Sequence, residues 1–295
     1  MIILEDWRNG EFYISASRRL KIIGDIFQID RYGRSLTIGK KKPKKIKVDN
    51  NLKVEKKEDS KSAFYRAKVR IRDAINANAY QYRDLKGRII KPMFLSLTFR
   101  KLITSLDIGH REFTNFIKRF NYLITGKNRC YLKYVSVVEF QKRGAIHYHV
   151  VLFNLPFIKN IYDKLAKIWT VGSRNIIPID NIQNIGQYVC KYMTKTGVDD
   201  RLKARKSYFI SRDLKKPTIL YSSRHIRMIE TQLEKLPADV KHEVLIESLE
   251  YIISVDRKIY NLFDDKALAQ KLREEVTDYI KEQNDELHSI RQKIV

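Results

Sequence analysis

The central part of the chain, residues 93–218, alternates short apolar runs with longer segments of helical periodicity. Two of the apolar runs are separated by residues 140–145, where Gly144 suits a turn, so we expect them to pair as an antiparallel hairpin. The pattern predicts an α+β fold with one central antiparallel sheet and flanking helices. Strands are expected at 93–100, 132–139, 147–154 and 175–179, and helices at 109–124, 159–169 and 181–195.

Helical periodicity also occurs on both sides of this part. Apolar residues recur at helical spacing from Phe64 to Ile75, which predicts a basic helix over 60–80. Near the C-terminus, apolar positions at 244–253 and at 268–280 predict two charged helices. The sequence leaves open whether these two helices pack on the main domain, form an oligomer contact or bind accessory factors.

The first part of the chain has neither pattern. Short apolar runs separated by turn residues before residue 38 indicate small strands. The lysine-rich segment 40–57 indicates either a solvated linker or a DNA-contacting arm, because like charges repel and Pro43 interrupts regular pairing. We therefore expect three regions. They are a basic N-terminal region at 1–58, a main domain at 59–222 and a helical C-terminal region at 223–295.

Composition adds a partner and a compartment to this picture. The 295 residues include 59 Lys and Arg against 34 Asp and Glu, a formal net charge of +25. Such an excess favours a polyanionic partner, and nucleic acid is favoured over an acidic membrane because no basic amphipathic helix with a Trp-rich face stands out. Two cysteines, Cys130 and Cys190, and the lack of an apolar run of about 18 residues favour a reduced, cytoplasmic setting without membrane contact.

Two histidines on one predicted strand are the first sign of chemistry. His147 and His149 are two residues apart, so they point to the same face of a strand while Tyr148 points to the other. Glu139 ends the preceding strand of the hairpin and can reach the same face. Two imidazoles with a carboxylate suit a hard divalent cation, Mg²⁺ or Mn²⁺, although a His-x-His triplet alone also arises by chance.

A second group of reactive side chains lies on the predicted helix 181–195. Tyr188, Tyr192 and Lys195 have the spacing of one helical face, and Lys191 lies beside it. By itself this spacing is typical of a half-buried amphipathic edge. With a metal site, it becomes a candidate for catalysis, because a phenol with a pKa of about 10 needs a cation to attack a phosphodiester at neutral pH.

Three blocks of the sequence together resemble the HUH endonuclease superfamily. They are the strand at 94–99, the metal block from Glu139 to Phe153 and the tyrosine block from Tyr188 to Lys195. The likeness is to rolling-circle replication initiators of single-stranded DNA phages and Gram-positive plasmids, and it covers about residues 62–222. The middle position of the histidine pair departs from the usual apolar residue, since Tyr148 stands there.

The resemblance implies a specific activity. The chain would nick single-stranded or locally melted origin DNA, form a 5′-phosphotyrosyl link and release a 3′-hydroxyl as primer. Because Tyr188 and Tyr192 are both present, it implies two transesterifications on alternating tyrosines. A host helicase and polymerase would be partners, and the oligomeric state stays open.

Two other functions compete with this one. A non-catalytic single-strand binder explains the charge and the sheet, but leaves the histidines and tyrosines without a role. A transposase or relaxase of the same superfamily fits less well, since small transposases have one nucleophilic Tyr and relaxases carry a three-His cluster. The remaining histidines are predicted to be structural or exposed; they are His110, His225, His242 and His288.

Overall fold

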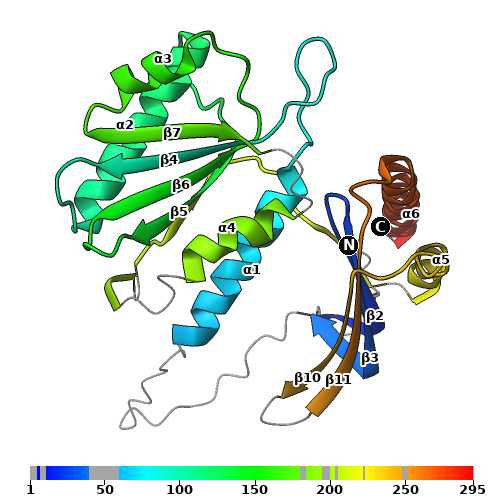
Figure 1. The fold of residues 1–295 in the computed structure, drawn as a ribbon. Coiled ribbons are helices and arrows are strands. Elements are labelled where there is room, and N and C mark those ends of the chain that lie inside the picture. Colours follow the sequence, from blue (N-terminus) through cyan, green and yellow to red (C-terminus); the bar gives the residue numbers. More distant parts are fainter. Residues whose placement is uncertain are drawn as a thin grey trace. The chain divides into compact units, whose positions relative to one another are not determined.

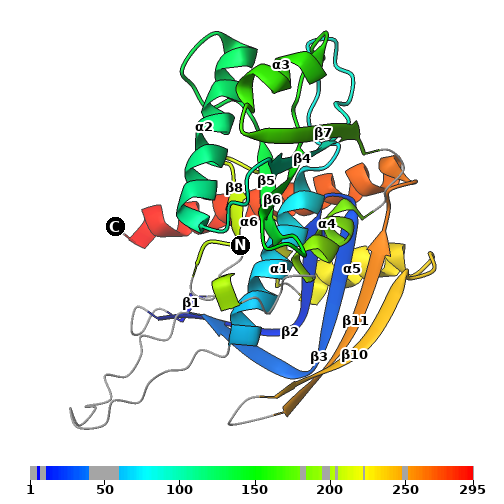
Figure 2. The ribbon, with the colours of Figure 1, turned by 60° about the vertical axis from the view of Figure 1, so that its left-hand side comes forward.

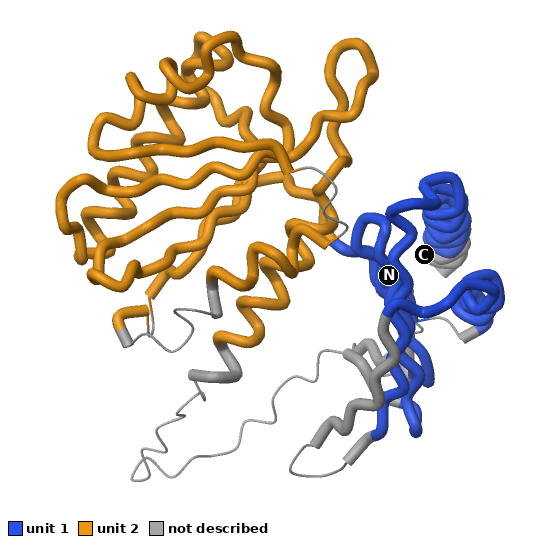
Figure 3. The backbone as a smooth tube through the Cα atoms, in the orientation of Figure 1, with its two compact units in different colours: residues 1–56, 217–295 blue, residues 57–216 orange. Residues whose placement is uncertain are grey.

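The computed structural model describes residues 5–6, 11–39, 60–179, 184–194, 200–202, 205–221, 223–247 and 252–294. The chain divides into two compact units, shown in Figure 3. One is formed by residues 57–216, and the other combines residues 1–56 with residues 217–295. The α+β class is confirmed, with an antiparallel sheet in each unit.

The unit of residues 57–216 is built on a five-stranded antiparallel sheet with the order β7-β4-β6-β5-β8. The predicted hairpin is confirmed as β5 and β6, and Gly144 lies in its turn with a φ of 85°. The short strand β8 was not expected from the sequence. The strands are β4 (Met93–Phe99), β5 (Tyr134–Phe140), β6 (Ile146–Leu152), β7 (Gly172–Pro178) and β8 (Tyr208–Ile210).

Helices cover both faces of this sheet (Figure 1). One face packs Leu97 and Tyr148 against α2 and α3, and the other packs Val137 and Val151 against α1 and α4. Residues that alternate along each strand therefore enter two separate apolar cores. The predicted helices are confirmed as α1 (Ser60–Asn78), α2 (Leu106–Thr125), α3 (Ile161–Ile168) and α4 (Ile185–Thr194), followed by the short 3₁₀ helix η1 (Asp200–Leu202).

The second unit is a sheet with the order β1-β2-β3-β11-β10, and β9 pairs with β2. Leu20 and Phe27 from the sheet share a core with Ile226 of α5 and Leu272 of α6. Pairing of β3 with β11 joins the N-terminal and C-terminal segments. The elements are β1 (Glu5–Asp6), β2 (Glu11–Ile23), β3 (Ile26–Gly39), β9 (Thr218–Leu220), α5 (Ser223–Leu233), β10 (Val240–Glu247), β11 (Ile252–Asn261) and α6 (Lys266–Ile294).

The helix predicted over 244–253 is wrong, because β10 and β11 form an antiparallel hairpin there. The stretch contains several β-branched residues, and β3 supplies a strand edge that extends the sheet through β11. Tertiary pairing thus overrides a local helical periodicity. The second predicted helix is confirmed within α6, and the small strands expected before residue 38 are confirmed as β2 and β3.

The lysine-rich segment 40–57 lies outside the described residues, so the choice between a linker and an arm stays a prediction. In the described part of the chain, no helix has the length and apolar character needed to cross a bilayer.

Candidate metal and tyrosine site

Glu139, His147 and His149 come together on the α4 side of the first unit's sheet. Glu139 pairs directly with His147 across β5 and β6, and His149 follows two residues later on the same face. Their ligand atoms all lie within 4.8 Å of one another. His149 Nε2 lies 2.6 Å from a carboxylate oxygen of Glu139. The structure therefore brings the three residues predicted as metal ligands into one cluster.

The neighbouring strand β4 orients both histidines. Its register places Ser96 opposite His149 and Thr98 opposite His147. The Ser96 hydroxyl and His149 Nδ1 share a hydrogen bond of 3.3 Å, and the Thr98 hydroxyl and His147 Nε2 share one of 2.9 Å. Such partners fix the ring orientation of metal-binding histidines. The sequence predicted the strand 93–100 but not this role of two hydroxyls at alternate positions.

The electrostatics of the cluster suit a cation. Burial, and after it the charge of His149, lower the pKa of His147 to about 4, while the charge of Glu139 acts in the opposite direction. His147 is therefore neutral at neutral pH and keeps a lone pair on its ring. Two imidazoles and one carboxylate are a fitting donor set for a divalent metal, with further positions left for water or a phosphate oxygen.

The two tyrosines of α4 lie over this cluster. The Tyr192 ring centroid is 4.0 Å from that of His149. The hydroxyls of Tyr188 and Tyr192 are 3.1 Å apart, and Phe94 packs against both rings. Lys191 is exposed, with its ammonium 5.9 Å from the centre of the Tyr188 ring. Lys195, the fourth residue predicted on this helix, lies outside the described residues.

The Tyr192 phenol is protonated at neutral pH. Burial raises its pKa to about 12, and the hydrogen bond with Tyr188 and the negative charges of Tyr188 and Glu139 act in the same direction. A phenol in this state is a poor nucleophile. Any reaction at Tyr192 therefore needs additional positive charge close to its oxygen.

Close packing of α4 on α1 sets the position of the tyrosines. A side chain at Gly186 would meet the Arg72 carbonyl oxygen at 2.4 Å, so only glycine allows this approach. The Asn76 side chain accepts a hydrogen bond from the Gly186 backbone at 2.8 Å and donates one to Asn184 at 2.9 Å. Asn184 in turn accepts from the Gln187 backbone, at the start of the helix. The sequence analysis missed Asn76 because nothing local links it to α4.

Tyr148 takes no part in the cluster. It is fully buried on the opposite face, stacked on Phe113 at 4.6 Å and hydrogen bonded to His110 Nδ1 at 2.8 Å. His110 thus has a structural role, as predicted. In the other unit, His225 stacks on Tyr279 at 3.3 Å. The side chains of His242 and His288 lie outside the described part.

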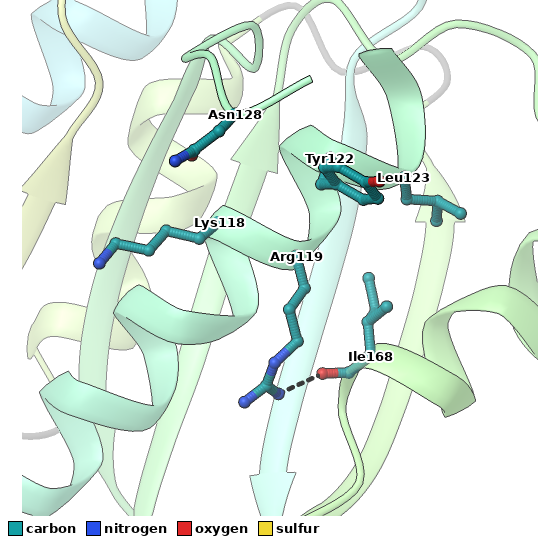
Figure 4. A pocket seen from close by; sticks show the side chains of 6 residues that line it. All are labelled: Lys118, Arg119, Tyr122, Leu123, Asn128 and Ile168. Atoms are coloured by element: carbon teal, nitrogen blue, oxygen red, sulfur yellow. Dashed lines mark hydrogen bonds between the residues drawn. The ribbon is translucent and has the colours of Figure 1, made fainter. Parts of the chain in front are cut away.

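A shallow hollow lies on the outer side of α2 and α3, as Figure 4 shows. It contains none of the residues of the metal and tyrosine cluster. Its lining consists of Lys118, Arg119, Tyr122, Leu123, Asn128 and Ile168.

Comparison with known proteins relates the same part of the chain to replication. Residues 92–197 match the model of a family described as "Replication-associated protein", of the ORF2 group. The "Phasyl DNA replicon protein arp" of Escherichia coli is 28% identical over 138 residues, which cover 38% of this chain and 46% of that protein. The chain thus spans about half the length of this curated relative. No solved structure matches it significantly. These matches support a part in replication.

Proposed function

We propose that the chain is a metal-dependent endonuclease that nicks single-stranded DNA at an origin and initiates rolling-circle replication. The observation that carries the proposal is the position of Tyr192, whose ring lies 4.0 Å from that of the candidate ligand His149. A non-catalytic binder needs no such juxtaposition. The family match over 92–197 covers the strands and the helix that form this arrangement.

The proposed chemistry is a transesterification. The oxygen of one tyrosine forms a bond to phosphorus, and the bond between phosphorus and the 3′ oxygen breaks. The 3′ oxygen leaves with the bonding electrons and takes up a proton, in exchange for the proton that the phenol loses. The products are a 5′-phosphotyrosyl enzyme and a 3′-hydroxyl that a polymerase can extend.

Each residue has a role in this proposal. Glu139, His147 and His149 hold Mg²⁺ or Mn²⁺, which supplies a Lewis acid for the scissile phosphate. Tyr188 and Tyr192 are the alternating nucleophiles, and the 3.1 Å between their hydroxyls allows both to reach one phosphate. Lys191 and Lys195 neutralise phosphate oxygens, which also favours the phenolate.

The proposed setting follows from charge and from the chemistry. A net charge of +25 suits binding of single-stranded or locally melted origin DNA. The released 3′-hydroxyl requires a polymerase, and extension along a circle requires a helicase, so host enzymes in the cytoplasm are the proposed partners.

The test is an adduct assay. Labelled single-stranded oligonucleotides that tile candidate origins are incubated with the protein and Mg²⁺ or Mn²⁺, and covalent protein–DNA species are separated under denaturing conditions. We expect an adduct with wild type and none with the Tyr188→Phe, Tyr192→Phe double variant. An adduct formed by the double variant would exclude these nucleophiles.

A second variant separates the enzyme from a plain binder. His149→Ala should lose the adduct but bind the oligonucleotides with the affinity of wild type. If wild type forms no adduct with any origin and binds single strands equally with and without metal, the non-catalytic binder is the correct function.

A further inference from the structure

The segment between α1 and β4 forms a projecting hairpin, residues 82–91, which we call the tip hairpin. Figures 1 and 2 show it as a cyan loop that extends beyond the ends of the strands of its unit. A bridge between Arg83 and Ile89 pairs its two arms. None of its residues belongs to the metal and tyrosine cluster.

The base of the tip hairpin is anchored in its unit. The Tyr82 ring stacks on Phe153 with centroids 6.3 Å apart, and its hydroxyl donates to the Asn78 side chain at 2.8 Å. The Ile90 backbone N–H donates to the Tyr82 carbonyl at 2.8 Å. These contacts hold both arms where they leave the body of the unit.

The turn at the far end is built around one carboxylate. Asp84 accepts hydrogen bonds from the backbone of Lys86 and of Arg88, each 2.9 Å, and pairs with the Arg88 guanidinium at 2.7 Å. Gly87 takes a φ of 76°, which the turn requires and which glycine adopts without strain. The only acidic group of the hairpin is therefore used inside it, which leaves its outer surface cationic.

This turn presents an apolar side chain in a cationic setting. Leu85 is fully exposed at 107%, and Ile89 is exposed at 46%. The four cationic residues around them are Arg83, Lys86, Arg88 and Lys91. Cations that attract phosphates, around an aliphatic side chain held out from a rigid turn, match the way proteins insert an apolar wedge between base steps of a duplex.

We infer that the tip hairpin is a DNA wedge: Leu85 inserts at the end of a duplex beside the single strand, and the cations contact the flanking phosphates. The partner is double-stranded DNA at a junction with single-stranded DNA. The inference deepens the proposed function, since it assumes that DNA is the partner, but it requires no cleavage.

Binding to three fluorescent DNAs in EDTA tests it: a single strand, a duplex and a fork with one single-stranded arm. Leu85→Ser should weaken binding to the fork about tenfold and leave single-strand binding unchanged, because one buried Leu side chain is lost only at the junction. Leu85→Met should bind like wild type. Phe157→Ser is the matched control, since Phe157 is also exposed, at 95%, on another loop.

Two further readouts follow the same mechanism. Lys86→Ala should reduce the slope of log affinity against log salt for the fork by about one. A 2-aminopurine base at the junction should brighten with wild type, as it unstacks, and not with Leu85→Ser. Because no metal is present, these results do not depend on nicking.

Equal binding of wild type and Leu85→Ser to all three DNAs would overturn the wedge, as would an equal loss on every DNA. Binding to phosphatidylserine vesicles that is lost in Leu85→Ser, with DNA binding unchanged, would assign the tip hairpin to a lipid surface and would also overturn it.

Discussion

Tyr192 lies against His149, with ring centroids 4.0 Å apart, although the two residues belong to a helix and a strand that are distant in sequence. The hydroxyl of Tyr188 is 3.1 Å from that of Tyr192 but its ring contact is with Phe94, not with His149. The two tyrosines are therefore not equivalent with respect to the candidate metal ligands.

This difference predicts unequal effects of single substitutions. Tyr192→Phe should reduce the first-round adduct by at least about a hundredfold, because the oxygen nearer the cluster is lost. Tyr188→Phe should reduce it far less and instead block the rejoining step. The measurement is adduct formation and circle closure on a labelled origin strand. Equal loss of the first-round adduct in both variants would contradict the assignment.

Ser96 and Thr98 are predicted to control metal affinity through the histidines. Ser96→Ala and Thr98→Val should each weaken Mn²⁺ binding about tenfold, since a ring without its outer partner loses its orientation. Isothermal calorimetry with Mn²⁺ measures this directly.

The matched control is Ser136→Ala. Ser136 is fully buried on β5, opposite to the cluster, and its hydroxyl has no hydrogen-bond partner among the described residues. Mn²⁺ affinity should stay at the wild-type value. A loss as large as that of Ser96→Ala would show that the effect is general unfolding of the sheet.

Gly186→Ala is predicted to displace the tyrosine helix. The added Cβ would lie 2.4 Å from the Arg72 carbonyl oxygen, which is backbone and cannot move away cheaply. We expect a loss of about 2 kcal/mol in stability and loss of the adduct, with Mn²⁺ affinity nearly unchanged because the ligands lie on the sheet. Gln187→Ala, one residue along and exposed, should alter neither.

The metal-free protein should lose stability as the pH falls from about 6.5 to about 4. The pKa of His147 is lowered to about 4 in the folded protein, whereas the unfolded chain takes up the proton near 6.5. Protonation therefore favours unfolding in this window, and the stabilising effect is complete above it. His147→Gln should flatten the melting temperature in the same range. A parallel pH profile in the variant would show that other groups dominate.

The second unit is predicted to depend on Asp30. This carboxylate is fully buried, accepts from Arg257 Nε at 2.6 Å and pairs with Arg19. Burial raises its pKa, but the hydrogen bonds and charges of Arg257 and Arg19 outweigh this and lower it. Asp30→Asn should cost about 3 kcal/mol in urea unfolding, because it leaves buried cations without their counter-charge. Asp278→Asn, in an exposed ion pair, should change stability by less than about 0.5 kcal/mol.

The sequence by itself determined the features that depend on local periodicity. A period of two puts His147 and His149 on one face and Tyr148 on the other, and the hairpin turn at Gly144 brings Glu139 opposite His147. The helical period similarly places Tyr188 and Tyr192 together on α4. These relations involve residues close in the chain, so short-range geometry is enough.

Only the tertiary structure decided which distant elements meet. The approach of α4 to His149 depends on Gly186 and Asn76, and the hydroxyls of β4 reach the histidines only through the sheet register. The hairpin of β10 and β11 replaced a predicted helix because pairing with β3 supplied an edge that local periodicity does not record. Long-range strand pairing and helix packing gain their free energy from partners far along the chain, which a local pattern cannot specify.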